Sequence, residues 1–490
     1  MPRPLRILMV SAEVETFART GGLGDVVYGL SRALGRRGIE VVIVTPRYGI
    51  TKVPDDARWW WDPIAARVGW GPDDERQLGV LEAHVSDNVR VCLVADSFLF
   101  DRGGIYGDGG GTFDDNHVRF ATMSRAALSI ADRIWGSPHD GQGPDVIHAH
   151  DWHAALAIIY ARSAMGDAWR SIPTVFTIHN LAYQGVLGFD AVDELGLPRD
   201  LVRGDVLEHF GTVNLLKGAS ALADRVTAVS PTYANEIRTH RGGFGLDGFL
   251  RDASHKLVGI VNGIDPERYE PGYFAENARP SKRDRKVALG AELGLERDDR
   301  SPLFSCVSRL TSQKGIDLFL DALPAIVQRG ARIALVGTGE DSLERGLARA
   351  AEKFPRRVAS RVTFDEGLAR RIYGASDFFV IPSRFEPCGL TQLYAMRYGA
   401  IPIVTDVGGL HDTVAPYDPV RDTGTGFVAR SPDIMSIVLA LDDALTTWGD
   451  GAGMQGLIDR AMAYDSSWQK SASEYLSRVY QPITRWRDRG

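Results

Sequence analysis

The feature that most constrains this chain is an alternation of short apolar runs with segments of helical periodicity, in two separate series. Continuous apolar runs of this length predict strands buried on both faces, and the intervening helices imply parallel sheets. The runs lie at 5–10, 41–44, 145–150, 173–178, 225–229 and 257–261, and then at 303–308, 332–336, 361–364, 378–381, 401–404 and 426–428. The sequence therefore predicts an α/β fold with two doubly wound, Rossmann-like domains.

A stretch rich in proline, glycine and charge, 270–300, separates the two series and predicts a linker followed by a short helix. We expect a first domain over 1–262, a second over 263–464, and a cleft between their ligand-facing strand ends. An amphipathic segment at about 465–490 predicts a helix that crosses back to the first domain. Between 59 and 110 the pattern loosens, which predicts an irregular insertion.

Length and composition exclude several classes of protein. At 490 residues the chain is too long for one ordinary core, and 56 basic against 63 acidic residues give a net charge of −7. That charge argues against nucleic acid as the main partner. Three scattered cysteines, Cys92, Cys306 and Cys388, form neither a disulfide framework nor a zinc cluster. With no apolar run long enough for a bilayer and no signal peptide, we expect a cytoplasmic protein without a membrane partner.

The loop from Pro382 to Leu393 lies between a predicted strand and a helix that opens near Gly389. Free backbone amides and the helix dipole make such a place an anion site, usually for phosphate. Glu386 is unexpected there, since a phosphate repels a carboxylate. Either Glu386 accepts hydrogen bonds from sugar hydroxyls beside the phosphate, or it is an acid favoured by the dipole near a helix start. The loop alone leaves both interpretations open.

A second loop, from Arg19 to Asp25, follows the first predicted strand and contains Gly21 and Gly22. Glycines let a backbone approach a ligand closely. A dinucleotide site needs a different glycine spacing and an acid further along, which disfavours a nicotinamide dehydrogenase. A plain tight turn is the other alternative, and the flanking Arg19 and Asp25 favour a ligand loop over it.

Histidines gather where two further strands end. His148, His150 and His153 invite a metal interpretation, but the rest of a zinc site is absent, so we expect no metal. A polar cluster that orients a ligand suits the spacing better. His179 and Asn180 end the next strand, and parallel strands bring such ends to one edge, where open α/β sheets bind ligands.

In the second series, Arg309 and Lys314 follow the first strand and share an edge with the Glu386 loop. A solvated surface pair is the alternative. Together the two domains suit a ligand with an anionic middle and a polyol end, such as a nucleoside-diphosphate sugar. Arginine offers a planar fork to phosphate and lysine a point charge, so the leaving diphosphate could be stabilised without a divalent ion.

Several motifs, taken in chain order, resemble those of bacterial glycogen synthases. They are Arg19–Val26, His148–His153, Thr177–Gly185, Asn262–Asp265, Ser308–Gly315 and Pro382–Leu393. The resemblance runs over nearly the whole chain. It implies a retaining GT-B glycosyltransferase that moves glucose from ADP-glucose to the non-reducing end of an α-1,4-glucan such as glycogen, without a cofactor. It leaves the oligomeric state open.

The resemblance also implies roles for particular residues. Glu386 would hold the glucose hydroxyls, Arg309 and Lys314 would neutralise the diphosphate, and the His179 carbonyl would stabilise the cationic sugar. These four are the expected catalytic residues. Substrate contacts are implied for Arg19, Gly21, Gly22, Asp25, Tyr106, Asp151, Asn180, Asn262, Gly337, Phe364, Cys388, Gly389, Leu390 and Thr391.

Among these contacts, Phe364 would stack on adenine, and the amides of Gly389, Leu390 and Thr391 would bind phosphate. Tyr106 and Asp151 would lie on the acceptor side, and Cys388 would not act as a nucleophile. The family usually has lysine where this chain has Arg19.

Two further functions stay open. A related GT-B transferase that uses UDP- or GDP-sugars on a small acceptor would share Arg309, Lys314 and Glu386, and a donor screen separates it. A non-catalytic glucan-binding or regulatory protein would tolerate Glu386→Gln.

Overall fold

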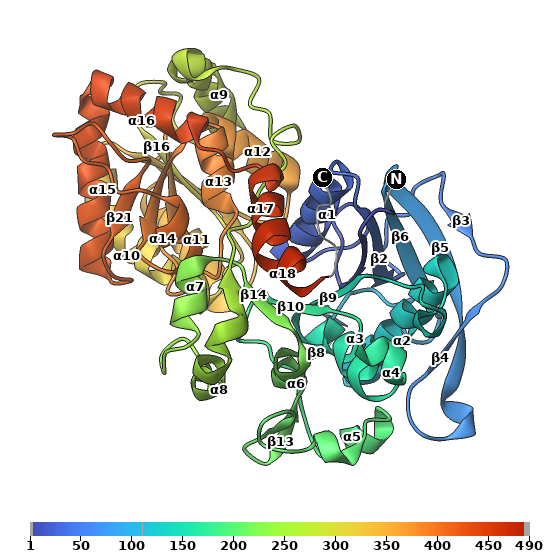
Figure 1. Cartoon of the computed structure of the whole chain (residues 1–490). Helices are drawn as coiled ribbons and strands as arrows, with labels where there is room; N and C mark the ends of the chain where they lie inside the picture. Colours follow the sequence, from blue (N-terminus) through green and yellow to red (C-terminus); the bar gives the residue numbers. More distant parts are fainter. Residues whose placement is uncertain (1–2, 110, 485–490) are drawn as a thin grey trace. The chain divides into compact units, whose positions relative to one another are not determined.

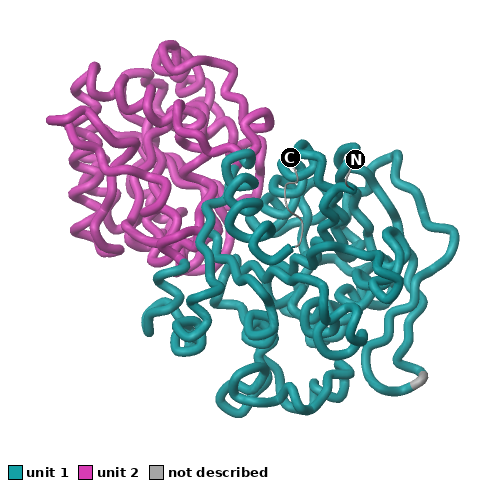
Figure 2. The backbone as a smooth tube through the Cα atoms, in the orientation of Figure 1, with its two compact units in different colours: residues 1–229, 234–263, 468–490 teal, residues 230–233, 264–467 magenta. Residues whose placement is uncertain are grey.

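The computed structural model describes residues 3–109 and 111–484, and these form two compact units (Figure 2). Unit 1 takes its described residues from 1–229, 234–263 and 468–490, and unit 2 from 230–233 and 264–467. The chain thus divides after 263 and after 467, and the short segment 230–233 is grouped with unit 2. The part of the expected C-terminal helix over 485–490 lies outside the described residues.

Unit 1 is built on a 10-stranded sheet (Figure 1). In sheet order the strands are β15 (Leu257–Gly259), β14 (Arg225–Ala228), β10 (Thr174–Ile178), β9 (Val146–His150), β1 (Arg6–Val10), β2 (Glu40–Pro46), β6 (Val89–Ala95), β5 (Glu75–Ser86) and β3 (Arg58–Trp59), with β4 (Ile64–Arg67) on β5. The strands from β15 to β6 run parallel and are mostly buried. Their continuous apolar runs follow from that two-sided burial.

Helices cover both faces of this sheet. The helices of this part of the chain are α1 (Gly22–Gly35), α2 (Asn116–Trp135), α3 (Asp151–Ser163), α4 (Asp167–Arg170), α5 (Ala191–Glu194), α6 (Leu215–Leu222), α7 (Pro231–Glu236, which begins in unit 2) and α8 (Asp247–Asp252). Helix α1 leads from β1 to β2, whereas α3 leads from β9 to β10 in the opposite direction across the sheet. Right-handed crossovers in opposite directions put α1 and α3 on opposite faces.

The C-terminal segment shares the face of α1. It consists of α17 (Trp468–Glu474), a π-helix (Tyr475–Tyr480) and α18 (Gln481–Ile483). Trp468 packs so closely on α1 that a Cβ added at Gly29 would lie 2.0 Å from its indole nitrogen. With side chains of α1 and the sheet, Trp468, Tyr475 and Tyr480 form one buried apolar cluster.

The region 59–110 is not the irregular insertion that we expected. Strands β5 and β6 pair antiparallel over most of their length, and β4 and β3 pair with β5. Along β5, buried Leu78 and Val80 alternate with more exposed residues. A strand with one wetter face lacks the continuous apolar run used to find the parallel strands. Smaller pairings elsewhere in unit 1 are β11 (Val186–Leu187), β13 (Thr212–Asn214) and β12 (Glu208–His209), and β7 (Gly107–Asp108) with β8 (Gly111–Thr112).

Unit 2 is built on a six-stranded parallel sheet. In sheet order the strands are β18 (Val358–Val362), β17 (Arg332–Gly337), β16 (Leu303–Val307), β19 (Phe378–Ile381), β20 (Ile401–Thr405) and β21 (Phe427–Ala429). Its helices are α9 (Ala278–Leu293), α10 (Ile316–Val327), α11 (Asp341–Lys353), α12 (Glu366–Ala375), α13 (Thr391–Arg397), α14 (Gly408–Thr413), α15 (Ile434–Gly449) and α16 (Gly451–Ala463).

The prediction of an α/β chain with two doubly wound sheets is confirmed. One strand lies earlier in the sequence than we predicted. We expected it at 361–364, but β18 spans Val358–Val362, so Phe364 lies beyond its end. Exposure explains the error, because Arg361 and Val362 at the end of β18 are exposed and the apolar pattern there is weak.

Candidate active site

The strand order of unit 2 reverses between β16 and β19. Strands β17 and β18 lie on one side of β16, and β20 and β21 lie beyond β19. The crevice at the carboxyl ends of the strands flanking such a reversal is where open α/β sheets bind ligands. Ser308–Gly315 follows β16, and Pro382–Leu390 follows β19. The two loops of the second series that the sequence singled out therefore meet at this reversal.

Lys314 and Glu386 are in direct contact at this place. Nζ of Lys314 lies 2.6 Å from Oε2 of Glu386, and Oγ of Ser383 donates to the same oxygen at 2.9 Å. Glu386 is only 5% exposed, so its carboxylate depends on these partners for its charge and hydrogen bonding. A helix-start acid favoured by the dipole alone would face solvent. The buried pairing instead fits a carboxylate held in one position.

Two close backbone approaches fix the loop around Glu386. Gly315 has φ +63°, and a Cβ there would lie 1.9 Å from the carbonyl oxygen of Pro382. A Cβ at Gly409 would lie 2.1 Å from the carbonyl oxygen of Cys388, and the Gly409 amide donates to the Glu386 carbonyl at 3.0 Å. Any larger residue at either glycine would displace the Glu386 loop.

Three other predicted residues of unit 2 lie at the carboxyl edge of the same sheet. Arg309 follows β16 and is exposed. Gly337 ends β17, where an added Cβ would lie 2.0 Å from the Ser308 carbonyl oxygen. Phe364 lies beyond the end of β18 and is 74% exposed. An exposed cation and an exposed aromatic ring at a ligand-binding edge are available for contacts with a ligand.

The turn into α13 carries the remaining predicted residues of unit 2. Gly389 has φ +73°, in the left-handed region, and Thr391 begins α13 after Leu390. Nε2 of Gln392 fixes this turn by donating to the carbonyls of Cys388 and Gly389, each at 3.0 Å. The first amides of a helix have no acceptor within the helix, so they are available for other acceptors. Cys388 is buried and is not part of a disulfide.

Unit 1 has its own reversal, between β1 and β9. Strands β2 and β6 lie on one side of β1, and β10, β14 and β15 lie beyond β9. The glycine loop follows β1, and the histidine-rich motif spans the end of β9 and the start of α3. The ligand-binding edge of unit 1 is therefore built from these two segments and from the end of β10.

Glu13 organises the glycine loop, and the sequence analysis missed it. Its carboxylate accepts the backbone amides of Thr20 at 2.7 Å and Gly21 at 3.0 Å, and the phenolic hydroxyl of Tyr106 at 2.6 Å. Glu13 is 3% exposed. Two amides of the loop are thus already occupied by a side chain. The one signal in the sequence was an acid between the apolar residues Ala12 and Val14, just past a strand end.

Arg19 pairs with two carboxylates that lie close to it in the sequence. Its Nη1 lies 2.7 Å from Oδ1 of Asp25 and 2.5 Å from Oε2 of Glu15. Glu15 is almost fully buried, and Asp25 stands in the first turn of α1, which begins at Gly22. The guanidinium therefore balances two acids, one of which, Glu15, the sequence analysis did not single out.

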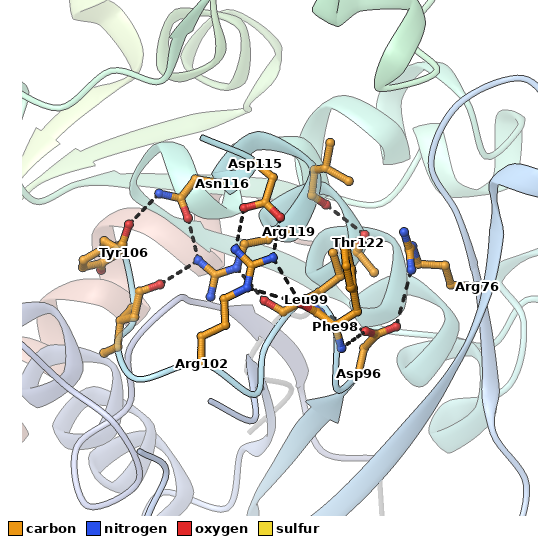
Figure 3. Close-up of polar contacts among 12 residues, drawn as sticks. Arg76, Asp96, Phe98, Leu99, Arg102, Tyr106, Asp115, Asn116, Arg119 and Thr122 are labelled. Atoms are coloured by element: carbon orange, nitrogen blue, oxygen red, sulfur yellow. Dashed lines mark hydrogen bonds and ion pairs between the residues drawn. The ribbon is translucent and has the colours of Figure 1, made fainter. Parts of the chain in front are cut away.

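Two arginines, Arg119 and Arg102, hold the loop that carries Tyr106 (Figure 3). Arg119, from α2, is fully buried and donates to the carbonyls of Leu99 at 2.7 Å and Ile105 at 2.9 Å. Arg102 binds both oxygens of Asp115, at 2.7 and 2.6 Å. The Tyr106 ring also packs on the ring of His153, with centroids 4.6 Å apart. These contacts fix Tyr106 where its hydroxyl meets Glu13.

Asp151 begins α3 in a strained conformation. Its φ is +56°, which is uncommon for a residue other than glycine, and it is 7% exposed. The His179 amide donates to Oδ1 at 2.7 Å, and the Asn180 amide lies 3.5 Å from the same oxygen. Burial raises the pKa of Asp151 to about 7, although these amides oppose the rise. Asp151, His179 and Asn180 are therefore brought together, as the shared sheet edge predicts.

Burial keeps the histidines of this edge neutral, and three of them are in contact with one another. Nδ1 of His150 lies 3.0 Å from Nε2 of His179, and the rings of His148 and His150 stack with centroids 4.2 Å apart. Burial lowers the pKa of His148, His153 and His179 to about 3. Asn262 is also buried in unit 1, and its Oδ1 has no hydrogen-bond partner among the described residues.

Two features of residues 3–109 and 111–484 bear on other functions. No group of three or more His, Cys, Asp or Glu side chains in this part of the chain is arranged to hold a metal ion. No helix there combines the length and apolar character needed to cross a bilayer.

Comparison with known proteins relates both units to one kind of enzyme. Residues 6–252 match the starch synthase catalytic domain family, and residues 301–447 match glycosyl transferases group 1. The chain is 40% identical to a glycogen synthase of Anaeromyxobacter dehalogenans, with 98% of this chain and all of the relative aligned. It is 37% identical to a glycogen synthase of Clostridioides difficile over the same shares of both chains.

Solved structures agree with these matches. The catalytic domain of starch synthase IV from Arabidopsis thaliana, determined with ADP and acarbose bound, superimposes with a TM-score of 0.89 at 33% identity and covers 98% of this chain and 99% of that one. The sucrose-phosphate synthase of Thermosynechococcus elongatus, at 18% identity and a TM-score of 0.61 over 98% and 99% of the chains, shares the fold.

Proposed function

Because this chain belongs to the family of bacterial glycogen synthases and starch synthases, we propose that it transfers glucose from ADP-glucose to the non-reducing end of an α-1,4-glucan, with retention of configuration. Membership makes it a glycosyltransferase with a nucleotide-sugar donor and a glucan acceptor. The choice of ADP is the finer part of the proposal. It is supported by the Arabidopsis relative, whose structure holds ADP.

The observation that carries the proposal is the buried contact between Lys314 and Glu386 at the strand reversal of unit 2. In our proposal Glu386 accepts hydrogen bonds from glucose hydroxyls. Arg309 and Lys314 stabilise the negative charge that appears on the diphosphate as the bond to the sugar breaks. The amides of Gly389, Leu390 and Thr391 add hydrogen bonds to phosphate. Phe364 offers its exposed face to adenine.

In unit 1 we assign His179 and Asn180 to the glucosyl group, with the His179 carbonyl facing the positive charge that develops on the sugar. Asp151 and Tyr106 are assigned to the glucan acceptor. Arg19, on the glycine loop with Gly21, Gly22 and Asp25, is assigned to the diphosphate side, where its guanidinium offsets the negative charge of Glu15 and Asp25. The buried Oδ1 of Asn262 is an unused acceptor that suits a substrate hydroxyl.

We also propose the cytoplasm as the working compartment, which the three buried thiols, none of them in a disulfide, support.

The experiment that tests the function supplies glycogen with ADP-, UDP- or GDP-glucose in parallel. Release of each nucleoside diphosphate and transfer of labelled glucose to glycogen are measured. We expect ADP-glucose to give the highest kcat/KM and the activity to survive EDTA, because Arg309 and Lys314 supply the positive charge. A preference for another donor would contradict the ADP assignment, and no transfer from any donor would overturn the function. If EDTA abolishes the activity and added magnesium or manganese restores it, the roles proposed for Arg309 and Lys314 would be wrong.

A further inference from the structure

A row of polar side chains crosses one face of the unit 1 sheet where apolar residues are expected. His150 on β9 lies opposite Thr177 on β10, which lies opposite Thr227 on β14. His148, two residues before His150, shares that face. All four side chains are fully buried. The C-terminal segment packs on this row, as Tyr475 and Tyr480 show by their contacts with His148.

The π-helix explains how two tyrosines reach one histidine. In an α-helix, residues five apart point about 140° away from each other. In the wider turn of a π-helix, whose hydrogen bonds run from i to i+5, such residues lie on the same side of the helix. Tyr475 and Tyr480 are five apart in this π-helix, and each ring centroid lies 5.8 Å from that of His148.

Both ring nitrogens of His148 are occupied. Nδ1 lies 2.8 Å from the Tyr480 hydroxyl, and Nε2 lies 2.6 Å from Oγ1 of Thr177. The position and plane of the His148 ring are therefore fixed by groups on the π-helix and on β10. His150 stacks on this ring with planes 30° apart, so the plane of His150 is fixed as well.

His150 in turn is in hydrogen-bonding contact with His179. Its Nδ1 lies 3.0 Å from Nε2 of His179, whereas its Nε2 is buried without a hydrogen-bond partner among the described residues. Burial lowers the pKa of both rings, so both are neutral and each has one N–H. If His179 donated to His150, the proton of His150 would sit on its unpartnered Nε2. A buried N–H without an acceptor is the costlier of the two possibilities.

We propose that Tyr480, His148 and His150 are positioning residues for His179, and that His150 donates from Nδ1 to Nε2 of His179 so that the proton of His179 is held on Nδ1. In this arrangement His150 selects the tautomer of His179, and the C-terminal segment, far along the chain, fixes the His148 ring on which His150 stacks. The value of this arrangement to catalysis rests on the function proposed above, since a neutral ring with a fixed N–H donor suits a sugar hydroxyl.

The tautomer is tested directly by ¹⁵N spectra of histidine-labelled protein, with His179 assigned by its absence in His179→Gln. We expect the wild type to carry the His179 proton on Nδ1. In His150→Leu, which removes the donor, the His179 proton should shift towards Nε2. In His150→Asn, whose amide can donate from nearly the same place, the wild-type tautomer should be retained. A wild-type His179 protonated on Nε2 would overturn the proposal.

Kinetics test the consequence. We expect His150→Leu to lower kcat about tenfold, with KM for the donor nearly unchanged, and Tyr480→Phe to lower it by less. His150→Asn should recover most of the activity. The matched control is Tyr160→Phe. Tyr160 lies on α3, and its buried hydroxyl donates to the Leu195 carbonyl at 2.7 Å rather than to a histidine. This control variant should reduce thermal stability to the same degree as Tyr480→Phe and leave kcat unchanged.

Equal losses of kcat in Tyr480→Phe and Tyr160→Phe would mean that the tyrosine acts only on stability and would overturn the positioning role. If His150→Leu does not fold, His150→Asn and Tyr480→Phe still decide the matter. If the wild type transfers no glucose, the proposed function fails, but the ¹⁵N spectra still establish or refute the tautomer assignment.

Discussion

The hydroxyl of Tyr106 donates to the carboxylate of Glu13 at 2.6 Å, across 93 residues of sequence. Because the same carboxylate holds the amides of Thr20 and Gly21, this one contact joins the loop fixed by Arg119 to the glycine loop. A hydrogen bond to a buried charged group contributes about 1.5–3 kcal/mol, more than a bond between neutral groups.

Tyr106→Phe should therefore lower kcat/KM for the glucan by roughly tenfold or more, since each factor of ten corresponds to about 1.4 kcal/mol. Tyr48→Phe is the control, because its buried hydroxyl donates to a neutral acceptor, the Ala12 carbonyl, at 2.9 Å. Initial rates at varied glycogen concentration measure both variants. Equal losses of kcat/KM in Tyr106→Phe and Tyr48→Phe would contradict a specific role for the Tyr106 hydroxyl.

Glu386→Gln should lower kcat by about 100-fold or more while ADP binding changes little, because a group that acts on the reacting sugar is lost rather than one that binds the nucleotide. Turnover and ADP titration calorimetry give the two numbers. Asp317→Asn is the control, since Asp317 binds Arg384 on the same loop at 2.8 and 2.6 Å without contacting Glu386. A Glu386→Gln enzyme with most of its turnover would refute the assignment.

Arg19→Ala should lose on the order of 2–4 kcal/mol of transition-state stabilisation, and Arg19→Lys should keep a substantial part of the activity. Removing the guanidinium leaves Glu15 and Asp25 without this cation, so the anionic loop would repel a diphosphate. Lysine restores the charge but not the fork. Values of kcat/KM for ADP-glucose and UDP-glucose measure the effect, and the ADP preference should persist in both variants. An undiminished rate in Arg19→Ala would exclude a donor role.

Asp151→Asn should change the pH dependence of stability in a defined direction. The pKa of the Asp151 carboxyl is about 3.9 in the unfolded chain and about 7 in the folded protein. Below about pH 4 both states are protonated, and the carboxyl contributes nothing. As the pH rises towards 7 only the unfolded state loses its proton, so the free energy of unfolding of the wild type falls. Above about pH 7 both states are ionised, so the loss in the free energy of unfolding stays constant.

The variant should thus match the wild type near about pH 4 and exceed it near about pH 8 by on the order of a few kcal/mol. Asparagine can still accept the His179 amide, and it tolerates the positive φ of this position. Thermal midpoints across the pH range provide the test, with Asp167→Asn as an exposed control. Parallel curves for Asp151→Asn and the wild type would show that folding does not raise the pKa of this carboxyl.

Phe364→Ala should raise KM for ADP-glucose several-fold and leave stability within about 0.5 kcal/mol, because the ring is exposed and packs on no core. The effect on UDP-glucose should be smaller, since a purine offers more stacking area. Val362→Ala, at a half-exposed position on the same strand end, is the control. If Phe364→Ala changes KM equally for ADP-glucose and UDP-glucose, the ring does not discriminate between the bases.

Burial on both faces explains which parts of the fold were predictable. β1 and β19 are covered on both sides, so their apolar runs identified them without ambiguity. β5 was missed because its pattern mixes exposed and buried residues, whereas β6 was missed although its run is apolar and mostly buried. The amphipathic C-terminal segment led us to expect a boundary near 464, whereas the compact units divide after 467. The grouping of 230–233 with unit 2 leaves no signal in the local sequence pattern.

At the site, the sequence identified residues near strand ends but not their partners. Lys314 and Glu386 were placed on one edge by topology, whereas their contact depends on the register of β16 and β19 and on the space left by Gly315. Glu13 belonged to no motif, since its role is to accept amides of a loop that only the folded chain brings to it. Long-range hydrogen bonding of this kind leaves no periodic signal.

The cover of the histidine row by residues 475–480 also sets an order of events during synthesis on the ribosome. Multidomain chains generally complete their N-terminal domain first. Here residues 264–467 have all been synthesised before the π-helix that shields His148 from water. The nascent chain can close the sheet of unit 2 while one face of unit 1 still lacks its cover. The unit that starts the chain is therefore the later one to be finished.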